Sequence, residues 1–217
     1  ESLALLRESG NTWSMAFSLS NLGRAAFAEA DYEQAGVYYR EAIEIRERLG
    51  DARGKALALL YLGDTAMAEA DLATARQAFQ ASLAIFRDIG SRSSSAEALV
   101  CLGHVASREG QAKQARRAFV EALELAQEGQ TMRPMLEAML GLAGLMIQKR
   151  PEQALLTAQL IAGHPATVES TRQAAGEMIR QIAGKAAGDA PAALTAEEAV
   201  RDMDEVASAI LRSARLE

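Results

Sequence analysis

The chain has 217 residues, of which 49% are hydrophobic, 24% charged and only 5% aromatic, and 46 are alanine. This composition is typical of a helix-rich globular protein, and no apolar stretch approaches the roughly 20 residues that a membrane-spanning helix needs. One cysteine and two histidines are too few for an internal disulfide or a four-ligand zinc site, and a net charge of −6 gives no overall basic surface for nucleic acid. We therefore expect a cytoplasmic protein without a cofactor that binds neither membranes nor nucleic acid.

A repeat of 40 residues organises most of the chain. A leucine–glycine pair recurs at this step as Leu22-Gly23, Leu62-Gly63 and Leu102-Gly103, and Leu142-Ala143 follows in the same register. Four further columns keep the same step: Ala26, Ala66 and Ala106; Ala35, Ala75 and Ala115; Tyr39, Phe79 and Phe119; Ala42, Ser82 and Ala122. Such self-similarity indicates an array of repeated supersecondary units.

Each repeat is predicted to form two amphipathic helices. Apolar residues in the first repeat recur three and four positions apart, as Leu19, Leu22 and Ala26 do, and then Tyr39 and Ile43. This spacing places them on one face of an α-helix and not on one face of a strand.

Capping residues predict where these helices begin and end. Asp31 and Asp71 are placed to accept hydrogen bonds from the free amides at the start of the second helix, and Gln34 would complete a capping box in the first repeat. The second helix is expected to end near Gly50 and Gly90, because glycine accepts the left-handed conformation that follows many helix ends.

The repeated columns also predict how the helices pack. Glycine in the first helix and alanine in the second let the two backbones approach, while the aromatic column fills the gap to the next unit. On this interpretation leucine at Gly103 would overpack the third unit, whereas alanine there would be tolerated. Because a single helical hairpin cannot bury both faces, we predict an all-α solenoid of stacked antiparallel helix pairs.

The array gives the following domain organisation. Residues 1–11, with Leu3, Leu5 and Leu6, are the remnant of a preceding second helix, and four hairpins follow at about 12–51, 52–91, 92–131 and 132–163. The fourth departs from the pattern, since Pro151 opens its second helix one residue early and Ala158 replaces the aromatic. Residues 164–217 form C-terminal capping helices around a linker at 185–194. The chain begins with Glu1 and no signal peptide, so we expect it to be a piece of a larger protein.

The repeat columns resemble those of the tetratricopeptide repeat (TPR) over roughly residues 12–163, and the segment NLGRAAFAEADYEQAGVYYREAIEI is similar to that family's consensus. This resemblance implies a right-handed superhelical solenoid. The step of 40 residues and the linking GDARGKA segment are similar to the arrays of bacterial STAND-class signalling ATPases and large transcriptional regulators. The departures are the longer step, alanine where a tyrosine is common in the first helix, and no proline at the unit ends.

No residue pattern predicts catalysis. Cys101 and His104 lie three apart on one helix without a third group to orient a base, so packing is the simpler interpretation. His164 precedes a proline and is interpreted as a turn residue. The carboxylates at 197–198 and 202–205 are expected on a solvated helix face, and no glycine-rich phosphate loop is present. We therefore predict that the chain is not an enzyme and has no metal site.

The first helices leave one face that does not carry the packing columns, and we call it the concave face. It is expected to include Ser20, Phe27, Leu60 and Val100, and its candidate partner-binding residues mix aromatic, apolar and charged side chains. These candidates are Phe17, Asn21, Arg24, Tyr61, Asp64, Met67, His104 and Arg108. Such a surface is suited to an extended peptide or a helix, although some of these residues could instead belong to the core between repeats. Chaperone-binding TPR domains hold a carboxylate with lysine and asparagine here, and Ser20 and Arg24 do not match that pattern.

Two functions remain open at this stage. The first is a protein–protein interaction module, the sensor or scaffold array of a bacterial signalling protein, whose upstream domains would include an NTPase. The second is a self-assembly element in which the apolar first edge and an amphipathic C-terminal helix, with Val200, Met203, Val206, Ile210 and Leu211 on one side, pack against a second copy.

Overall fold

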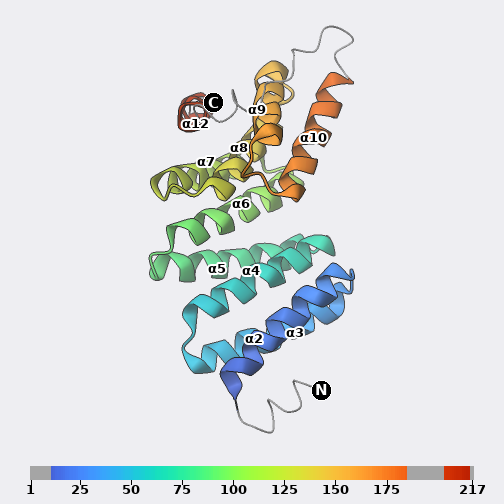
Figure 1. Ribbon diagram of the computed structural model, residues 1–217, viewed down its shortest axis with the longest axis vertical. Coiled ribbons are helices and arrows are strands. Elements are labelled where there is room, and N and C mark those ends of the chain that lie inside the picture. The colour runs from blue at the N-terminus through green and yellow to red at the C-terminus, as the bar shows by residue number, and fades with distance from the viewer. Residues whose placement is uncertain (1–10, 185–202, 216–217) are drawn as a thin grey trace. The chain divides into compact units, whose positions relative to one another are not determined.

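The computed structural model describes residues 11–184 and 203–215, and over these ranges the chain is entirely helical (Figure 1). The helices in chain order are α2 (Thr12–Ala28), α3 (Tyr32–Leu49), α4 (Ala52–Ala68), α5 (Leu72–Asp88), α6 (Arg92–Arg108), α7 (Ala112–Glu128), α8 (Met132–Met146), α9 (Pro151–Gly163), α10 (Glu169–Ala183) and α12 (Met203–Arg215). The expected helix of residues 1–11, the linker at 185–194 and the start of the last helix fall outside the described residues, apart from Asn11.

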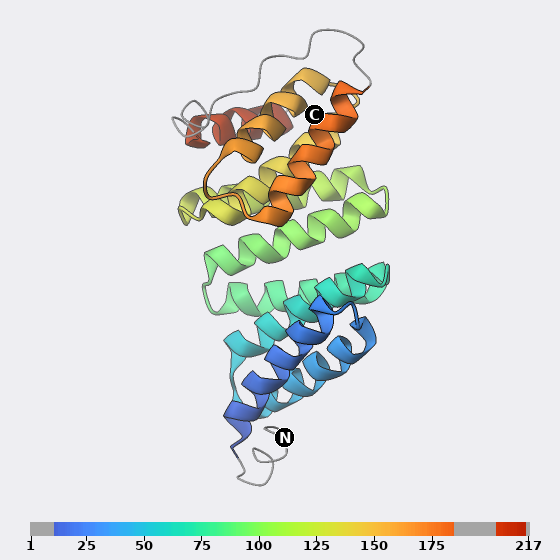
Figure 2. The ribbon, with the colours of Figure 1, turned by 45° about the vertical axis from the view of Figure 1, so that its right-hand side comes forward.

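The chain divides into two compact units, residues 1–105 and 106–217, with the division near the end of α6. In the first unit α2 packs against α3, α3 against α4 and α4 against α5, and α2 also reaches α4. In the second unit α7 packs against α8, α8 against α9 and α9 against α10, while α12 lies against α7 and α8 (Figure 2). Within each unit, sequential helices therefore stack as antiparallel pairs, as predicted.

Side-chain caps begin the helices of the first unit. Asp31 Oδ1 accepts a hydrogen bond from the Gln34 amide at 3.1 Å, and Asp71 Oδ1 accepts one from Thr74 at the same distance. Both predicted caps are confirmed, and the hydrogen bonds from Thr74 lower the pKa of Asp71. The predicted capping box is wrong in its second half, because the Asp31 amide donates to the Ala26 carbonyl at 2.9 Å instead of to Gln34.

A residue in the left-handed conformation stands at every twentieth position from 30 to 130, between successive helices. These residues are Ala30 (φ 61°), Gly50 (φ 69°), Ala70 (φ 60°), Gly90 (φ 70°), Gly110 (φ 72°) and Gln130 (φ 50°). The predicted turns at Gly50 and Gly90 are confirmed. Alanine has no preference for this conformation, so nothing in the residue type predicts the turns at Ala30 and Ala70.

The aromatic column lies directly on the glycine column. A Cβ added to Gly23 would lie 2.6 Å from Tyr39 Cε1, and one added to Gly63 would lie under 3 Å from the Phe79 ring. The ring therefore occupies the space in its own helix pair, and it does not only fill the gap to the next unit as expected. Even a methyl group at Gly23 or Gly63 would meet the ring. The expectation that alanine is tolerated at Gly103 stays a prediction.

A glycine also meets the aromatic column between the third and fourth pairs. A Cβ added to Gly141 of α8 would lie 2.5 Å from Cε1 of Phe119, which belongs to α7 of the preceding pair. Gly141 is one repeat step beyond Cys101 and two beyond Tyr61. The missing side chain lets α8 approach the preceding helix α7 more closely than a tyrosine or cysteine would.

Arg46 ties the first helix pair to the second. This side chain is buried near the end of α3, and its Nη1 donates to the Gly54 carbonyl at 2.6 Å while its Nε lies 3.8 Å from Asp51 Oδ2. Burial lowers the pKa of Arg46, and the nearby Asp51 opposes that shift. The hydrogen bond and the ion pair hold the start of α4 against α3, and so help to position the side chains of α4.

We expect Ala70→Gly to raise the free energy of unfolding by about 0.5–1 kcal/mol, because glycine removes the cost of a left-handed alanine, partly offset by a more flexible unfolded chain. Gly50→Ala should lower it by about 1 kcal/mol, since nothing lies within 4 Å of its Cβ position and strain alone is added. Urea denaturation measures both. Ala25→Gly, inside α2, is the control and should destabilise; a loss of stability in Ala70→Gly as large as in this control would contradict the assignment.

Gly63→Ala should lower the free energy of unfolding by about 1–3 kcal/mol, because its Cβ overlaps the Phe79 ring. In a Phe79→Leu background the same change should cost clearly less, since the ring is gone, and a double-mutant cycle from thermal or urea unfolding measures the coupling. Gly144→Ala, with only Met178 Cε at 3.6 Å, is the matched control and should be neutral or stabilising. Additive effects in the cycle would show that the ring and the glycine do not compete for space.

Candidate protein-binding site

A pocket of about 210 Å³ opens between the first two helix pairs. Five side chains line it: Arg24 and Phe27 from α2, Tyr39 from α3, and Tyr61 and Asp64 from α4. All five belong to the first compact unit. We call this the α2–α4 pocket.

The repeat itself brings these residues together. Arg24 and Phe27 are three positions apart on α2, and Tyr61 and Asp64 are three apart on α4, so each pair projects from one side of its helix. Arg24 and Asp64 occupy the same column, one repeat step apart. The helices α2 and α4 are the first helices of successive pairs, and they contact each other. Residues of the same repeat column therefore lie side by side, which places both charges at the rim of the pocket.

Aromatic rings form the floor and walls. Tyr39 is only 2% exposed, and its ring centroid lies 5.5 Å from that of Tyr61 at an interplanar angle of 30°. Phe27 is half-buried, and its ring is 5.3 Å from the ring of Tyr32. These contacts fix the rings before any ligand arrives, so binding need not order them.

The electrostatics of the pocket keep its floor neutral. Burial raises the pKa of Tyr39 to about 12, with further contributions in the same direction from Tyr61 and Asp64 and an opposing one from Arg24. The phenol is therefore protonated at neutral pH. Arg24 and Asp64 are exposed at the rim. The arrangement can hold one apolar or aromatic side chain between rings, with a cation and an anion beside it.

The structure places the predicted concave-face residues unevenly. Phe17, Asn21, His104 and Arg108 are exposed like the two rim charges, whereas Tyr61 and Met67 are half-buried. The pocket gathers Arg24, Tyr61 and Asp64 from that set, and also Phe27. That these residues bind a partner stays a prediction.

Three residues expected on the concave face lie in the core instead: Ser20, Leu60 and Val100. They form one column of the repeat, and each precedes by one position a residue that is exposed or half-buried. A step of one residue turns a helix by about 100°, which is enough to move a side chain from the rim into the packing surface. Ser20 satisfies its hydroxyl there by donating to the Ala16 carbonyl at 3.1 Å.

The sequence predicts only a packing role for Tyr39, yet this residue also forms the pocket floor. Its column contains phenylalanine in the next two repeats, at Phe79 and Phe119. A hydroxyl present in one repeat alone is a signal that this position borders polar surroundings, because a buried phenol needs a partner or access to water.

The other packing predictions fall in two groups. The glycines Gly23, Gly63 and Gly103 and the alanines Ala35, Ala75 and Ala115 are buried, as are Phe79 and Phe119. The leucines of the repeated pair, Leu22, Leu62 and Leu102, are only half-buried. Leu62 packs with Tyr61 against the core cluster that holds Tyr39.

The remaining chemical candidates on α6 are Cys101 and His104. Cys101 is half-buried and His104 is exposed on α6, and no group of three His, Cys, Asp or Glu among residues 11–184 and 203–215 could hold a metal ion. The carboxylates at 197–198 and 202 lie outside those ranges. No described helix is long and apolar enough to cross a membrane.

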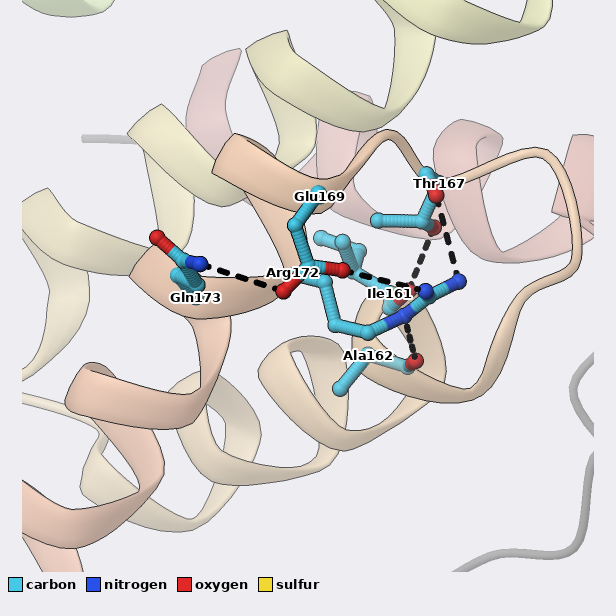
Figure 3. Close-up of polar contacts among 6 residues, drawn as sticks. All are labelled: Ile161, Ala162, Thr167, Glu169, Arg172 and Gln173. Carbon is cyan, nitrogen blue, oxygen red and sulfur yellow. Dashed lines mark hydrogen bonds and ion pairs between the residues drawn. The ribbon is translucent and has the colours of Figure 1, made fainter.

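His164 and its neighbours instead build the joint between α9 and α10. His164 is buried and its Nδ1 accepts a hydrogen bond from the Ala166 amide at 3.1 Å. Thr167 Oγ1 donates to the Ile161 carbonyl at 2.5 Å, and Arg172 donates to the carbonyls of Ala162 and Thr167 at 3.2 and 3.1 Å (Figure 3). Side chains thus satisfy the carbonyls that the end of α9 leaves open.

Comparison with known proteins agrees with this architecture. Residues 14–88 match the family model of the tetratricopeptide repeat, a stretch that contains the whole α2–α4 pocket. No protein in the search of curated proteins matches the chain.

Among solved structures, the chain is similar to BtubC (BKLC) from P. vanneervenii, with 18% identity, a TM-score of 0.64, and coverage of 95% of this chain and 85% of that one. It is also similar to the nearly identical TPR-like repeats named for a Podosopora anserina kinesin light chain. A form of these repeats with a single substitution has 15% identity and a TM-score of 0.59 over 100% of this chain and 99% of that one. A second structure of the repeats has 16% identity and the same TM-score over 94% and 98%. The fold is therefore an all-α, TPR-like solenoid.

The His164 joint should weaken in acid. Burial lowers the pKa of His164 below its ordinary 6.5, so the unfolded chain binds a proton first and stability falls as the pH drops below about 6.5. His164→Asn is the control, because its side-chain oxygen can accept the same amide hydrogen bond and does not titrate. Between pH 7.5 and pH 5.0 the urea midpoint of unfolding should fall further for the wild type than for this variant. Equal falls would show that His164 does not contribute to the loss of stability in acid.

Proposed function

We propose that the chain is the non-catalytic sensor or scaffold array of a larger bacterial signalling protein, and that it binds a segment of a partner protein on its concave face. Tetratricopeptide repeats generally mediate protein–protein interaction, and the matched stretch contains the α2–α4 pocket. The observation that carries the proposal is this pocket, lined by three aromatic rings with one cation and one anion at its rim. The upstream NTPase domains and the cytoplasmic setting are part of the proposal.

The pocket suits a peptide anchored by one side chain. Fully burying a leucine or phenylalanine side chain contributes about 1.5–3 kcal/mol, which is enough to select a peptide but not to bind it alone. The opposite charges of Arg24 and Asp64 then fix the direction of the peptide, since a reversed peptide would bring like charges together. Further exposed residues such as Asn21 extend the surface along the first helices.

We expect Arg24→Glu and Asp64→Arg to abolish or redirect peptide binding while the melting temperature stays within a few degrees, because both side chains are exposed. The ligand is found by selecting random peptides on the immobilised chain, and fluorescence anisotropy then measures each variant's affinity. Arg40→Glu, an exposed reversal of the same sign on α3, is the matched control and should bind as the wild type does.

Tyr61→Ala distinguishes the contribution of the aromatic rings from that of the charges at the rim. If peptides anchor a side chain between the rings, this variant should lose about tenfold or more in affinity while its charges are unchanged, since the lost burial is worth at least one such factor. Selected peptides that bind all three variants as they bind the wild type would place the binding surface elsewhere on the chain and overturn the proposal.

A further inference from the structure

The Tyr39 hydroxyl in the α2–α4 pocket has no partner within the protein. Tyr39 is only 2% exposed and belongs to the floor of the pocket. In the part of the chain that the structure describes, this hydroxyl neither donates nor accepts a hydrogen bond. Because a buried hydroxyl without a hydrogen bond costs free energy, the group depends for a partner on whatever fills the pocket.

The hydroxyl has the pocket walls as its polar surroundings. One edge of the Tyr39 ring is already covered, since its Cε1 and Cδ1 lie 2.6 and 2.9 Å from the Cβ position of Gly23. Burial is the main cause of the raised pKa of Tyr39, and the side chains that modify this shift are Tyr61, Arg24 and Asp64. All three line the pocket, so the phenol is directed at the space where a ligand would lie.

Packing does not require this hydroxyl. The equivalent residues of the next two repeats are Phe79 and Phe119, which are fully buried without one. The Phe79 ring covers Gly63 as the Tyr39 ring covers Gly23. The phenol therefore adds nothing to the helix pair except a group that can both donate and accept a hydrogen bond, and that group is available to a ligand.

The pocket has the size and lining for one aromatic side chain. Its volume of about 210 Å³ is below the roughly 300–1,000 Å³ of pockets that hold drug-sized ligands. The rings of Phe27, Tyr39 and Tyr61 line it, and rings pack favourably on one another in offset or tilted contacts. A short polar side chain such as serine would leave these rings uncovered.

The charges at the rim favour a neutral tip on that side chain. Arg24 and Asp64 both line the pocket, so an ionised tip would be attracted by one of them and repelled by the other. A hydroxyl tip is able to accept a hydrogen bond from Tyr39 and to donate one to a carboxylate. A phenylalanine or leucine side chain does neither, and it would displace water from the Tyr39 hydroxyl without replacing the lost hydrogen bond.

We propose that the α2–α4 pocket selects a tyrosine side chain of the partner peptide, and that the Tyr39 hydroxyl determines this preference by hydrogen bonding to the hydroxyl of the ligand. This inference rests on the proposed function, because it names the side chain that the peptide-binding pocket accepts. A site that hydrogen-bonds a ligand hydroxyl discriminates against the analogue without it, since its own polar group is then left unpaired.

A double-mutant cycle between chain and peptide tests the hydrogen bond. Peptides are selected from a random library on the immobilised full chain, and the tightest binder is also synthesised with each tyrosine replaced in turn by phenylalanine. Fluorescence anisotropy should show about tenfold weaker binding of one such phenylalanine peptide to the wild type. On the Tyr39→Phe variant the same two peptides should bind within about twofold of each other. Tyr38→Phe is the matched control, since it removes a hydroxyl from α3 outside the pocket, and it should discriminate as the wild type does.

A second selection, on the Tyr39→Phe variant, distinguishes a role in specificity from a role in packing. The anchor residue of the selected peptides should change from tyrosine to phenylalanine or leucine. The urea midpoint of unfolding should not fall, because phenylalanine already fills this column in the next two repeats. A fall in the midpoint with unchanged peptide choice would show that the hydroxyl serves the fold and not the ligand.

The outcomes separate this inference from the proposed function. Peptides that need Arg24 and Tyr61 but carry no tyrosine overturn the tyrosine preference and leave peptide binding at the pocket in place. The same conclusion follows if replacing the tyrosine weakens binding equally on the wild type and on Tyr39→Phe. Peptides that bind Arg24→Glu, Asp64→Arg and Tyr61→Ala as they bind the wild type overturn both proposals.

Discussion

The contact between an aromatic ring and a bare glycine sets the spacing inside the first two helix pairs. Tyr39 on Gly23 and Phe79 on Gly63 allow the two helices to lie closer than any larger residue would permit. Close pairs can bury alanine-rich faces, which explains how a chain with so few aromatic residues still forms a core. The α2–α4 pocket follows from the same contact, because the Tyr39 ring that covers Gly23 also lies between the first two pairs, where it lines the pocket.

The sequence predicted the features that repeat and that have only one physical explanation. Columns 40 residues apart with helical spacing predict stacked helix pairs, and Asp31 and Asp71 predict caps because few other residue types can accept those amides. Gly50 predicts a turn because few other residue types accept the left-handed conformation. In each case the residue type itself carries the conformational preference, so no knowledge of the surroundings is needed.

Other features depended on surroundings that a sequence does not display. Ala30 adopts a left-handed turn because the helices on both sides demand it, although alanine does not favour it. Ser20 and Leu60 are buried, although the next residue along the helix is exposed or half-buried. Periodicity alone does not place a side chain to within the roughly 100° of one helical step. Gly141 meets Phe119 of the preceding pair at a position where the earlier repeats carry Tyr61 and Cys101, so the repeat pattern does not predict this contact. The candidate site was likewise predictable for Arg24 and Asp64 as non-repeating charges, but not for Tyr39, whose burial concealed its second contact.

The residues in the left-handed conformation at every twentieth position from 30 to 130 imply how such an array can change its length. A single added helix of the same length would keep every turn and cap in phase. It would, however, exchange the roles of first and second helix in each later pair, and so set an aromatic residue where the partner backbone needs a glycine. Only an addition of two helices preserves both the phase of the turns and the alternation of bulk. The solenoid can therefore lengthen only in steps of one helix pair. The length of peptide that its first helices could span changes in the same steps.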